Sequence, residues 1–124
     1  MEPAPVGVGV LGCGNVGAAL LTLIDEQRFE VARRTGLALE VRAVAVRDPG
    51  RARDVSVDSA LFTNDPESVV TDGEIDVVVE VMGGVEPAHR LVVQALDSGK
   101  PVVTANKELI AAHGAELYSR AEAA

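Results

Sequence analysis

The chain has 124 residues, of which 48% are hydrophobic and only 2% aromatic, and its formal net charge is −8. This size and composition predict one domain over residues 1–124 with a core of aliphatic side chains, and they exclude a disordered chain. The acidic balance argues against nucleic-acid binding and membrane attachment, and short apolar runs after an acidic N-terminus predict a cytoplasmic protein without a signal peptide.

The first half of the chain predicts a strand, a long helix and a second strand. Residues 6–11 form the first strand, after a lead-in whose two prolines disfavour strand structure. Helical spacing of apolar residues runs from Asn15 to about Arg34, and Gly36 is the expected stop. The second strand covers 37–46 and ends in a turn of sequence R-D-P-G.

The second half alternates short strands with helices. The expected elements are an edge strand at 61–63, a helix that begins at Pro66 and ends by 71–73, a buried strand at 75–81, a helix at 87–98, a buried strand at 101–103, and a last helix interrupted at Gly114. This alternation predicts an α/β, Rossmann-like, doubly wound sheet that is mostly parallel and has helices on both faces.

The first strand runs directly into the sequence G-C-G-N-V-G, and a helix follows it. In that setting the G-x-G-x-x-G pattern predicts dinucleotide binding. Gly12 allows the tight turn, Gly14 allows the backbone to approach a pyrophosphate, and Gly17 allows the helix to pack on the strand. The free amides of the helix N-terminus face the phosphates. An ordinary tight turn is the alternative interpretation.

Ligands of such sheets lie at the carboxyl ends of the strands. Arg47 follows the second strand, where the adenosine ribose lies, and an arginine there accommodates the 2′-phosphate of NADP. We therefore predict NADP as the preferred cofactor, with NAD as the alternative because Asp48 comes next and the gap from the glycine motif is unusually long. A solvated turn arginine is the other interpretation.

Lys107 is a candidate catalytic residue, because it is one of only two lysines and follows Asn106, a good N-cap. A lysine in the first turn of a helix is disfavoured by the macrodipole, which points to a function in proton transfer or in binding a substrate oxygen. A solvated lysine is the alternative. The other lysine, Lys100, is expected to be a surface residue.

The remaining reactive side chains have structural interpretations. Cys13 is the only cysteine, which excludes an internal disulfide, and we interpret it as a small filler rather than a reactive thiol. Glu80 is either a buried carboxylate that organises the loop at Gly83 and Gly84 or a partly exposed strand-end residue. His89 and His113 lie on predicted helices with no partner carboxylate or cysteine in ligand spacing, so we predict surface or packing roles and no metal site.

Three stretches together resemble the N-terminal domain of homoserine dehydrogenases: V-G-V-G-V-L-G-C-G-N-V-G, D-V-V-V-E-V-M-G-G and G-K-P-V-V-T-A-N-K-E-L-I-A. The resemblance covers essentially the whole chain. It implies NAD(P)-dependent interconversion of L-homoserine and L-aspartate 4-semialdehyde by hydride transfer, in the biosynthesis of threonine, methionine and isoleucine.

The resemblance also assigns residues. The implied cofactor-binding residues are Gly12, Gly14, Asn15, Val16 and Gly17 at the pyrophosphate, Arg47 at the adenosine ribose, and Met82, Gly83, Gly84 and Thr104 near the nicotinamide. Lys107 matches the lysine that bridges cofactor and substrate and assists proton transfer.

Family members continue well beyond this length, with a substrate-binding and dimerisation domain. We therefore expect these residues alone to be inactive, the substrate to bind only with the missing domain, and the full-length enzyme to be a homo-oligomer. Two alternatives stay open: a related Rossmann dehydrogenase acting on another aspartate-derived substrate, and a non-catalytic nucleotide-sensing module.

Overall fold

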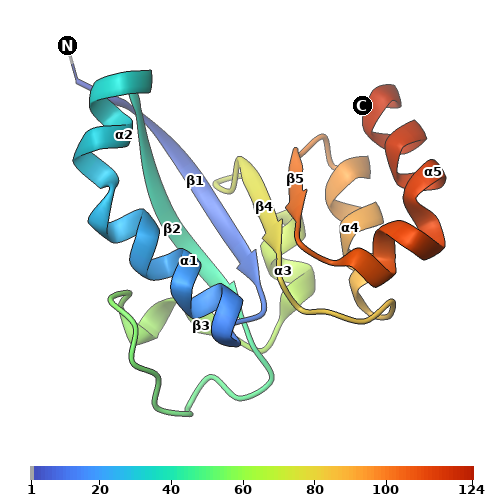
Figure 1. Ribbon diagram of the computed structural model, residues 1–124, viewed down its shortest axis with the longest axis horizontal. Helices are drawn as coiled ribbons and strands as arrows, with labels where there is room; N and C mark the ends of the chain where they lie inside the picture. Colours follow the sequence, from blue (N-terminus) through green and yellow to red (C-terminus); the bar gives the residue numbers. More distant parts are fainter. Residues whose placement is uncertain (1) are drawn as a thin grey trace.

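The computed structural model describes residues 2–124 and consists of a five-stranded parallel sheet flanked by helices (Figure 1). In chain order the elements are β1 Ala4–Leu11, α1 Asn15–Glu26, α2 Arg28–Thr35, β2 Leu37–Ala45, a 3₁₀ turn Ser59–Leu61, β3 Phe62–Thr63, α3 Pro66–Thr71, β4 Val77–Glu80, α4 Ala88–Asp97, β5 Val102–Thr104 and α5 Lys107–Ala123.

The strand order across the sheet is β3-β2-β1-β4-β5. The chain therefore moves outward from β1 to β3 and then crosses back, so that β4 lies on the other side of β1. Between β1 and β4 the order reverses, which is the position where doubly wound sheets bind their ligands. The predicted fold class is confirmed.

The sheet buries side chains on both faces, because residues of each strand alternate in direction. On the α1 side, Leu21 packs against Val8, Val10 and Val44. On the opposite side, α3 and α4 cover a cluster of aliphatic residues: Leu11, Ala45, Val69, Val70, Ile75, Val78, Leu91 and Ala95. Figure 1 shows α1 and α2 on one side of the sheet and α3 and α4 on the other.

The predicted interruption of the last helix at Gly114 is wrong, since α5 runs without a break. Leu109 and Leu117 of α5 pack against Val92 and Leu96 of α4. This packing offsets the roughly 0.5–1 kcal/mol that a glycine costs inside a helix. Gly114 is itself buried, at the point where a Cβ atom would lie 3.4 Å from the Ile110 side chain.

Other parts of the prediction also differ from the structure. The strand expected over 75–81 is the shorter β4, and the strand expected to be buried at 101–103 is β5, in which Val103 is 59% exposed. The helix expected over 15–34 is divided at Gln27 into α1 and α2. Strand β1 begins at Ala4 and includes Pro5. Pro5 is tolerated because β1 pairs with β4 only from Val8 onward, so this end of the strand has a ladder on one side only.

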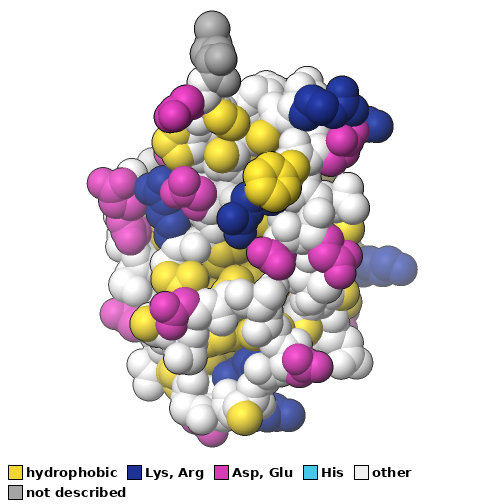
Figure 2. Space-filling model, turned by 90° about the vertical axis from the view of Figure 1, so that its left-hand side faces the viewer, with side chains coloured by type: hydrophobic (Ala, Val, Ile, Leu, Met, Phe, Trp, Pro, Cys, Tyr) yellow, Lys and Arg dark blue, Asp and Glu magenta, His cyan; other side chains and the backbone are white. Residues whose placement is uncertain are grey.

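The side of the molecule that carries α1 and α2 exposes several large apolar side chains, among them Val16, Leu23 and Phe29. Figure 2 shows this side, where hydrophobic side chains lie among acidic and basic ones. None of the helices within residues 2–124 has the length and apolarity needed to cross a bilayer.

Candidate functional site

A pocket of about 810 Å³ opens at the carboxyl ends of β1, β2 and β4, where the strand order reverses. Its walls come from the loops after β1, β2 and β4 and from the segment between β3 and the start of α3. The lining includes Gly12, Cys13, Gly14, Arg47, Arg51, Arg53, Met82 and Gly83. A smaller hollow of about 290 Å³ between α1, β2 and residues 56–61 contains none of the predicted site residues.

The three glycines of the loop after β1 occupy three different environments. Gly12 has φ +97°, and a Cβ atom there would lie 3.1 Å from the Val81 oxygen. At Gly17 a Cβ atom would lie 2.9 Å from the Gly12 oxygen, so α1 approaches the loop too closely for any side chain. At Gly14 no atom other than those of the glycine and its two chain neighbours lies within 4 Å of the Cβ position. The loop is thus tight at both ends and open toward the pocket in its middle.

Helix α1 begins at this open position. Its N-cap is Gly14, which supplies no side-chain acceptor, and its first turn carries no acidic residue. The amides of the first turn therefore have no intrahelical or side-chain acceptor, and they carry the positive end of the helix dipole. By contrast, the N-terminus of α3 is capped by Asp65 and that of α5 by Asn106. The arrangement at α1 favours an anion.

Basic side chains gather at the β2 end of the pocket. Arg47 and Arg51 are exposed, and Arg53 donates to the backbone oxygens of Asp48 and Arg51 at 2.9 and 3.0 Å. The Arg53 guanidinium also lies 5.1 Å from the centroid of the Phe62 ring. Sequence reasoning identified Arg47 and missed the other two arginines. Their grouping within residues 47–53 of a strongly acidic chain was the available signal.

Glu80 is fully buried at the end of β4 and accepts three hydrogen bonds. The donors are the Met82 amide at 2.8 Å, the Thr104 hydroxyl at 2.5 Å and the Asn106 amide group at 3.3 Å. The carboxylate thus fixes the start of the loop after β4 to the end of β5. Of the two interpretations of Glu80, the buried and loop-organising one is confirmed.

Asn106 extends this network to the last helix. Its side-chain nitrogen donates to the Gly84 oxygen at 2.5 Å, and its side-chain oxygen caps α5 by accepting from the Leu109 amide at 3.0 Å. The Thr104 hydroxyl accepts from the Asn106 backbone amide at 3.0 Å. Lys107, exposed at the first position of α5, follows this rigid junction directly. Sequence reasoning gave Asn106 the capping role but missed its bond to the Gly84 loop.

The pocket brings together only part of the predicted set. Gly12, Gly14, Arg47, Met82 and Gly83 line it. The other predicted residues lie on adjoining segments and are not among its lining residues: Asn15, Val16 and Gly17 in α1, Gly84 in the loop after β4, Thr104 at the end of β5, and Lys107 in α5.

Cys13 and Lys100 have structural environments. Burial raises the pKa of the Cys13 thiol, although the nearby Arg53 opposes this shift, so the thiolate is disfavoured. Lys100 is half-buried, and its ammonium donates to the backbone oxygens of Asp72 and Ile75 at 2.8 and 2.9 Å. It therefore joins the end of α4 to the loop before β4 and is not the simple surface residue expected.

The expectation that His89 has no partner carboxylate in ligand spacing is wrong. The His89 Nε2 atom lies 2.6 Å from Glu116 and its Nδ1 atom 3.0 Å from Glu86. Hydrogen bonding to Glu116, supported by Glu86, raises the pKa of His89 against the opposing effect of desolvation. Glu116 is 27 residues away from His89 along the chain, so spacing gave no sign of that contact. Glu86 lies only three residues before His89 and was a signal available in the sequence.

Comparison with known proteins decides the family. A family model described as "Homoserine dehydrogenase, NAD binding domain" matches residues 12–124. The chain belongs to the homoserine dehydrogenase family. It corresponds to the NAD-binding domain of that family, which favours the first sequence-based interpretation over both alternatives.

Relatives support this assignment over 94–96% of the chain. The homoserine dehydrogenase of Corynebacterium glutamicum is 46% identical over 119 residues, which are 96% of this chain and 26% of that protein. The enzyme of Pseudomonas aeruginosa is 44% identical over 117 residues, covering 94% of this chain and 26% of the relative. The chain thus spans about a quarter of the length of these curated homoserine dehydrogenases.

Solved structures of homoserine dehydrogenases have the same fold. The Staphylococcus aureus crystal structure at pH 8.5 superposes with a TM-score of 0.92 at 31% identity, covering 98% of this chain and 31% of that one. A hyperthermophilic archaeal homoserine dehydrogenase in complex with NADPH gives a TM-score of 0.74 at 25% identity, covering 96% of this chain and 41% of that one.

Proposed function

We propose that the pocket at the carboxyl ends of β1, β2 and β4 binds the nicotinamide dinucleotide. The observation that carries this proposal is the open space at Gly14 in front of the uncapped N-terminus of α1. A diphosphate placed there accepts hydrogen bonds from the amides of Asn15, Val16 and Gly17, while Gly12 sets the turn. Because the net charge of the chain is −8, its overall field does not attract a polyanion. The fixed backbone dipoles of this loop and helix end supply the local attraction instead.

NADP is the preferred form in this proposal. Arg47 lies at the end of β2, where the adenosine ribose of a doubly wound domain lies, and Arg51 and Arg53 line the same pocket. Guanidinium groups bind phosphate in a charge-assisted, often bidentate manner. Asp48 supports the competing choice of NAD, because a carboxylate there would accept from the ribose 2′-hydroxyl and repel a 2′-phosphate.

The nicotinamide side of the cofactor is assigned to Met82, Gly83, Gly84 and Thr104. The hydrogen bonds of Glu80 support this assignment, since they tie the loop after β4 to the end of β5. The backbone that would contact the nicotinamide ring is therefore held in place by the buried Glu80 carboxylate. Such support limits the movement of groups that position the reacting atoms.

For the whole protein we propose the oxidation of L-homoserine to L-aspartate 4-semialdehyde and the reverse reduction. The bound cofactor accepts or donates the hydride. Lys107 lies at the end of the network built by Glu80 and Asn106, so we assign it to the substrate hydroxyl oxygen, where it holds or transfers the proton released on oxidation. Residues 1–124 form the cofactor domain in this proposal, and substrate binding and subunit contacts belong to the remainder of the protein.

The full-length protein tests this function directly. Incubation with L-homoserine and NADP⁺ should produce NADPH, followed by its absorbance, and the Lys107→Ala variant should lower kcat far more than it weakens NADPH binding. We expect a loss of about 100-fold or more, the scale of general acid–base contributions. Absence of homoserine-dependent NADPH formation would refute the proposed reaction, and an unchanged kcat would refute the role of Lys107.

A further inference from the structure

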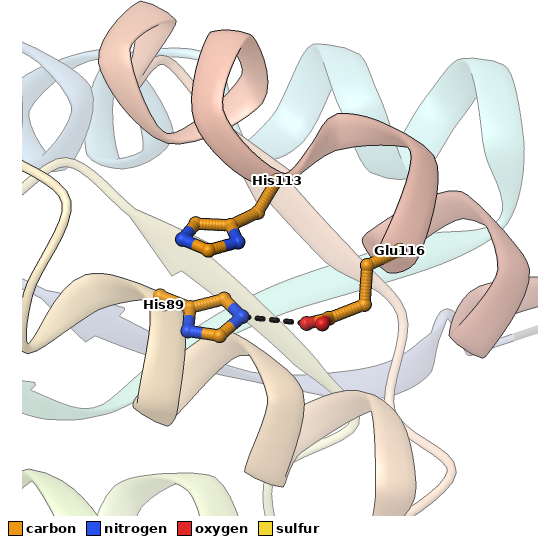
Figure 3. Close-up of side chains that lie close together, drawn as sticks. All are labelled: His89, His113 and Glu116. Carbon is orange, nitrogen blue, oxygen red and sulfur yellow. Dashed lines mark hydrogen bonds and ion pairs between the residues drawn. The ribbon is translucent and has the colours of Figure 1, made fainter.

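The helices α4 and α5 carry a cluster of potential metal ligands that the cofactor pocket does not use. His89 lies in the first turn of α4, and His113 and Glu116 lie one turn apart in α5. One ligand atom from each of the three side chains lies within 4.8 Å of the others. Figure 3 shows the two imidazole rings above one another and the Glu116 carboxylate beside them.

The geometry of the cluster is convergent. The two rings stack with centroids 3.8 Å apart and an interplanar angle of 14°. The His89 Nε2 atom lies 2.6 Å from the Glu116 oxygen, and Figure 3 shows one nitrogen of each ring on the side of that carboxylate. Two imidazole nitrogens and a carboxylate oxygen from two different helices therefore face one small volume.

Glu86 supplies a second feature of metal sites. Its carboxylate lies 3.0 Å from the Nδ1 atom of His89 and comes from the loop just before α4. Metal-ligating histidines almost always donate their other ring N–H to a carboxylate, carbonyl or water, which fixes the tautomer and orients the ring. A neutral His89 that donates from Nδ1 to Glu86 has its lone pair on Nε2, the atom that faces Glu116.

The charges around the cluster also permit a cation. Arg120 is a positive group that would compete with a bound cation, because its Nε atom lies 3.8 Å from a Glu116 oxygen. Its terminal nitrogen, however, donates to both oxygens of Asp97 at 3.1 and 2.9 Å. Asp97 thus holds and balances the guanidinium, while Glu86 and Glu116 contribute negative charge next to the two imidazoles.

We propose that His89, His113 and Glu116 form a binding site for one Zn²⁺ ion that links α4 to α5. Imidazole and carboxylate ligands suit zinc, and three protein ligands leave the fourth tetrahedral position to water. Glu116 is exposed enough for that water, with 43% of its side chain accessible. Zinc–ligand distances of about 2.0–2.2 Å bring the ligand atoms to about 3.3 Å from one another. The ligand atoms, which now lie within 4.8 Å of one another, must therefore move closer together when the ion binds.

A zinc ion bound at this site would link α4 to α5, two helices that also make apolar contacts with each other. Val92 and Leu96 of α4 already pack against Leu109 and Leu117 of α5. A metal that binds the folded arrangement and not the unfolded chain stabilises it in proportion to ligand occupancy. Because Glu86 also lines the cofactor pocket, the same loop contacts both sites.

The test is metal binding by the tag-free, full-length protein after removal of metals with a chelator. Zn²⁺ is titrated in competition with a chromophoric chelator, and the number of bound ions is compared among variants. Because other parts of the full-length protein can also bind zinc, the readout is the difference from the unsubstituted protein. His113→Asn should lose one equivalent of zinc or weaken its binding by at least about 100-fold. Glu86→Gln should weaken binding by about 10- to 100-fold, as changes of outer-shell partners do.

Glu122→Gln is the matched control, since it removes an exposed carboxylate from the same helix and should leave zinc binding unchanged. Co²⁺ substitution gives a second readout, because a tetrahedral site with imidazole ligands produces visible d–d absorption that His113→Asn should abolish. Circular dichroism of the metal-free variants shows whether they are folded. Equal zinc stoichiometry and affinity in the unsubstituted protein and in folded His113→Asn would overturn the proposal. NADPH binding should be retained in His113→Asn and Glu122→Gln, whose residues lie outside the cofactor pocket, so these two variants test the metal site independently of the proposed cofactor site.

Discussion

The substitution Gly14→Ala should separate cofactor binding from folding. No atom other than those of the glycine and its two chain neighbours lies within 4 Å of the Cβ position at Gly14, and its φ of −82° is accessible to any residue. The added methyl group therefore meets no protein atom. It does occupy the open middle of the loop, where the proposed diphosphate approaches the backbone.

The expected effect on stability is small because two contributions oppose each other. Alanine is a poorer N-cap than glycine by roughly 1 kcal/mol. Replacing glycine reduces the entropy of the unfolded chain, which stabilises the fold by about 0.4–1 kcal/mol. The free energy of unfolding should thus change by less than about 1 kcal/mol.

The expected effect on binding is much larger. A hydrogen bond from an amide to a charged phosphate contributes about 1.5–3 kcal/mol. Losing one such bond weakens affinity about 10- to 100-fold, since 1.4 kcal/mol corresponds to a factor of ten. We expect the Kd for NADPH to rise by this factor while the denaturation midpoint changes little.

Isothermal titration calorimetry with NADPH and urea denaturation measure the two quantities. Gly73→Ala is the matched control, because Gly73 also has nothing within 4 Å of its Cβ position but lies in an exposed turn outside the pocket. Gly17→Ala provides the opposite case: its Cβ atom would lie 2.9 Å from a backbone oxygen, so it should destabilise the fold by about 1–3 kcal/mol. Unchanged NADPH affinity in Gly14→Ala would refute the proposed diphosphate position.

Three further predictions follow from other parts of the structure. Arg47→Ala should weaken NADPH more than NADH in parallel titrations, and an equal loss for both would contradict a phosphate-binding role. Glu80→Gln should lower the free energy of unfolding by about 1–3 kcal/mol, because an amide cannot accept from all three donors of the buried carboxylate; the exposed Glu122→Gln serves as control, and equal stability of both variants would contradict the account. In the presence of a chelator, NMR titration of the folded protein should give His89 a pKa above the ordinary 6.5, since its partner Glu116 favours the protonated form. Because the folded-state pKa is raised, the stability that His89 contributes is full below pH 6.5 and is lost as pH rises through the higher value. Glu116→Gln should lower this pKa, and titration of His89 at or below 6.5 before substitution would contradict the hydrogen bonds.

Local sequence patterns predicted most of the fold because each depends on neighbouring residues. The β-branched run before Glu80 forms strand β4, and Pro66 starts α3 as expected. Gly36, the expected stop of the first helical stretch, ends α2 with φ +74°. The helix expected over 15–34 is divided at Gln27, where the sequence contains no glycine or proline. The local sequence therefore gave no signal for this division.

The parts that could not be predicted depend on contacts between distant residues. The bond from Asn106 to Glu80 joins residues 26 apart, and it arises only when β4 and β5 pair side by side. Likewise, His89 meets Glu116 only after α5 packs on α4. Spacing along the chain predicted a ligand site at the carboxyl ends of the strands, but the hydrogen-bond network at this edge required the folded structure.

The central claim is that the loop after β1 receives the diphosphate of a nicotinamide dinucleotide. A crystal structure of the full-length protein with NADPH tests it most directly. The account predicts diphosphate oxygens within hydrogen-bond distance of the backbone amides of residues 14–17. NADPH bound with its diphosphate elsewhere on this domain would contradict it.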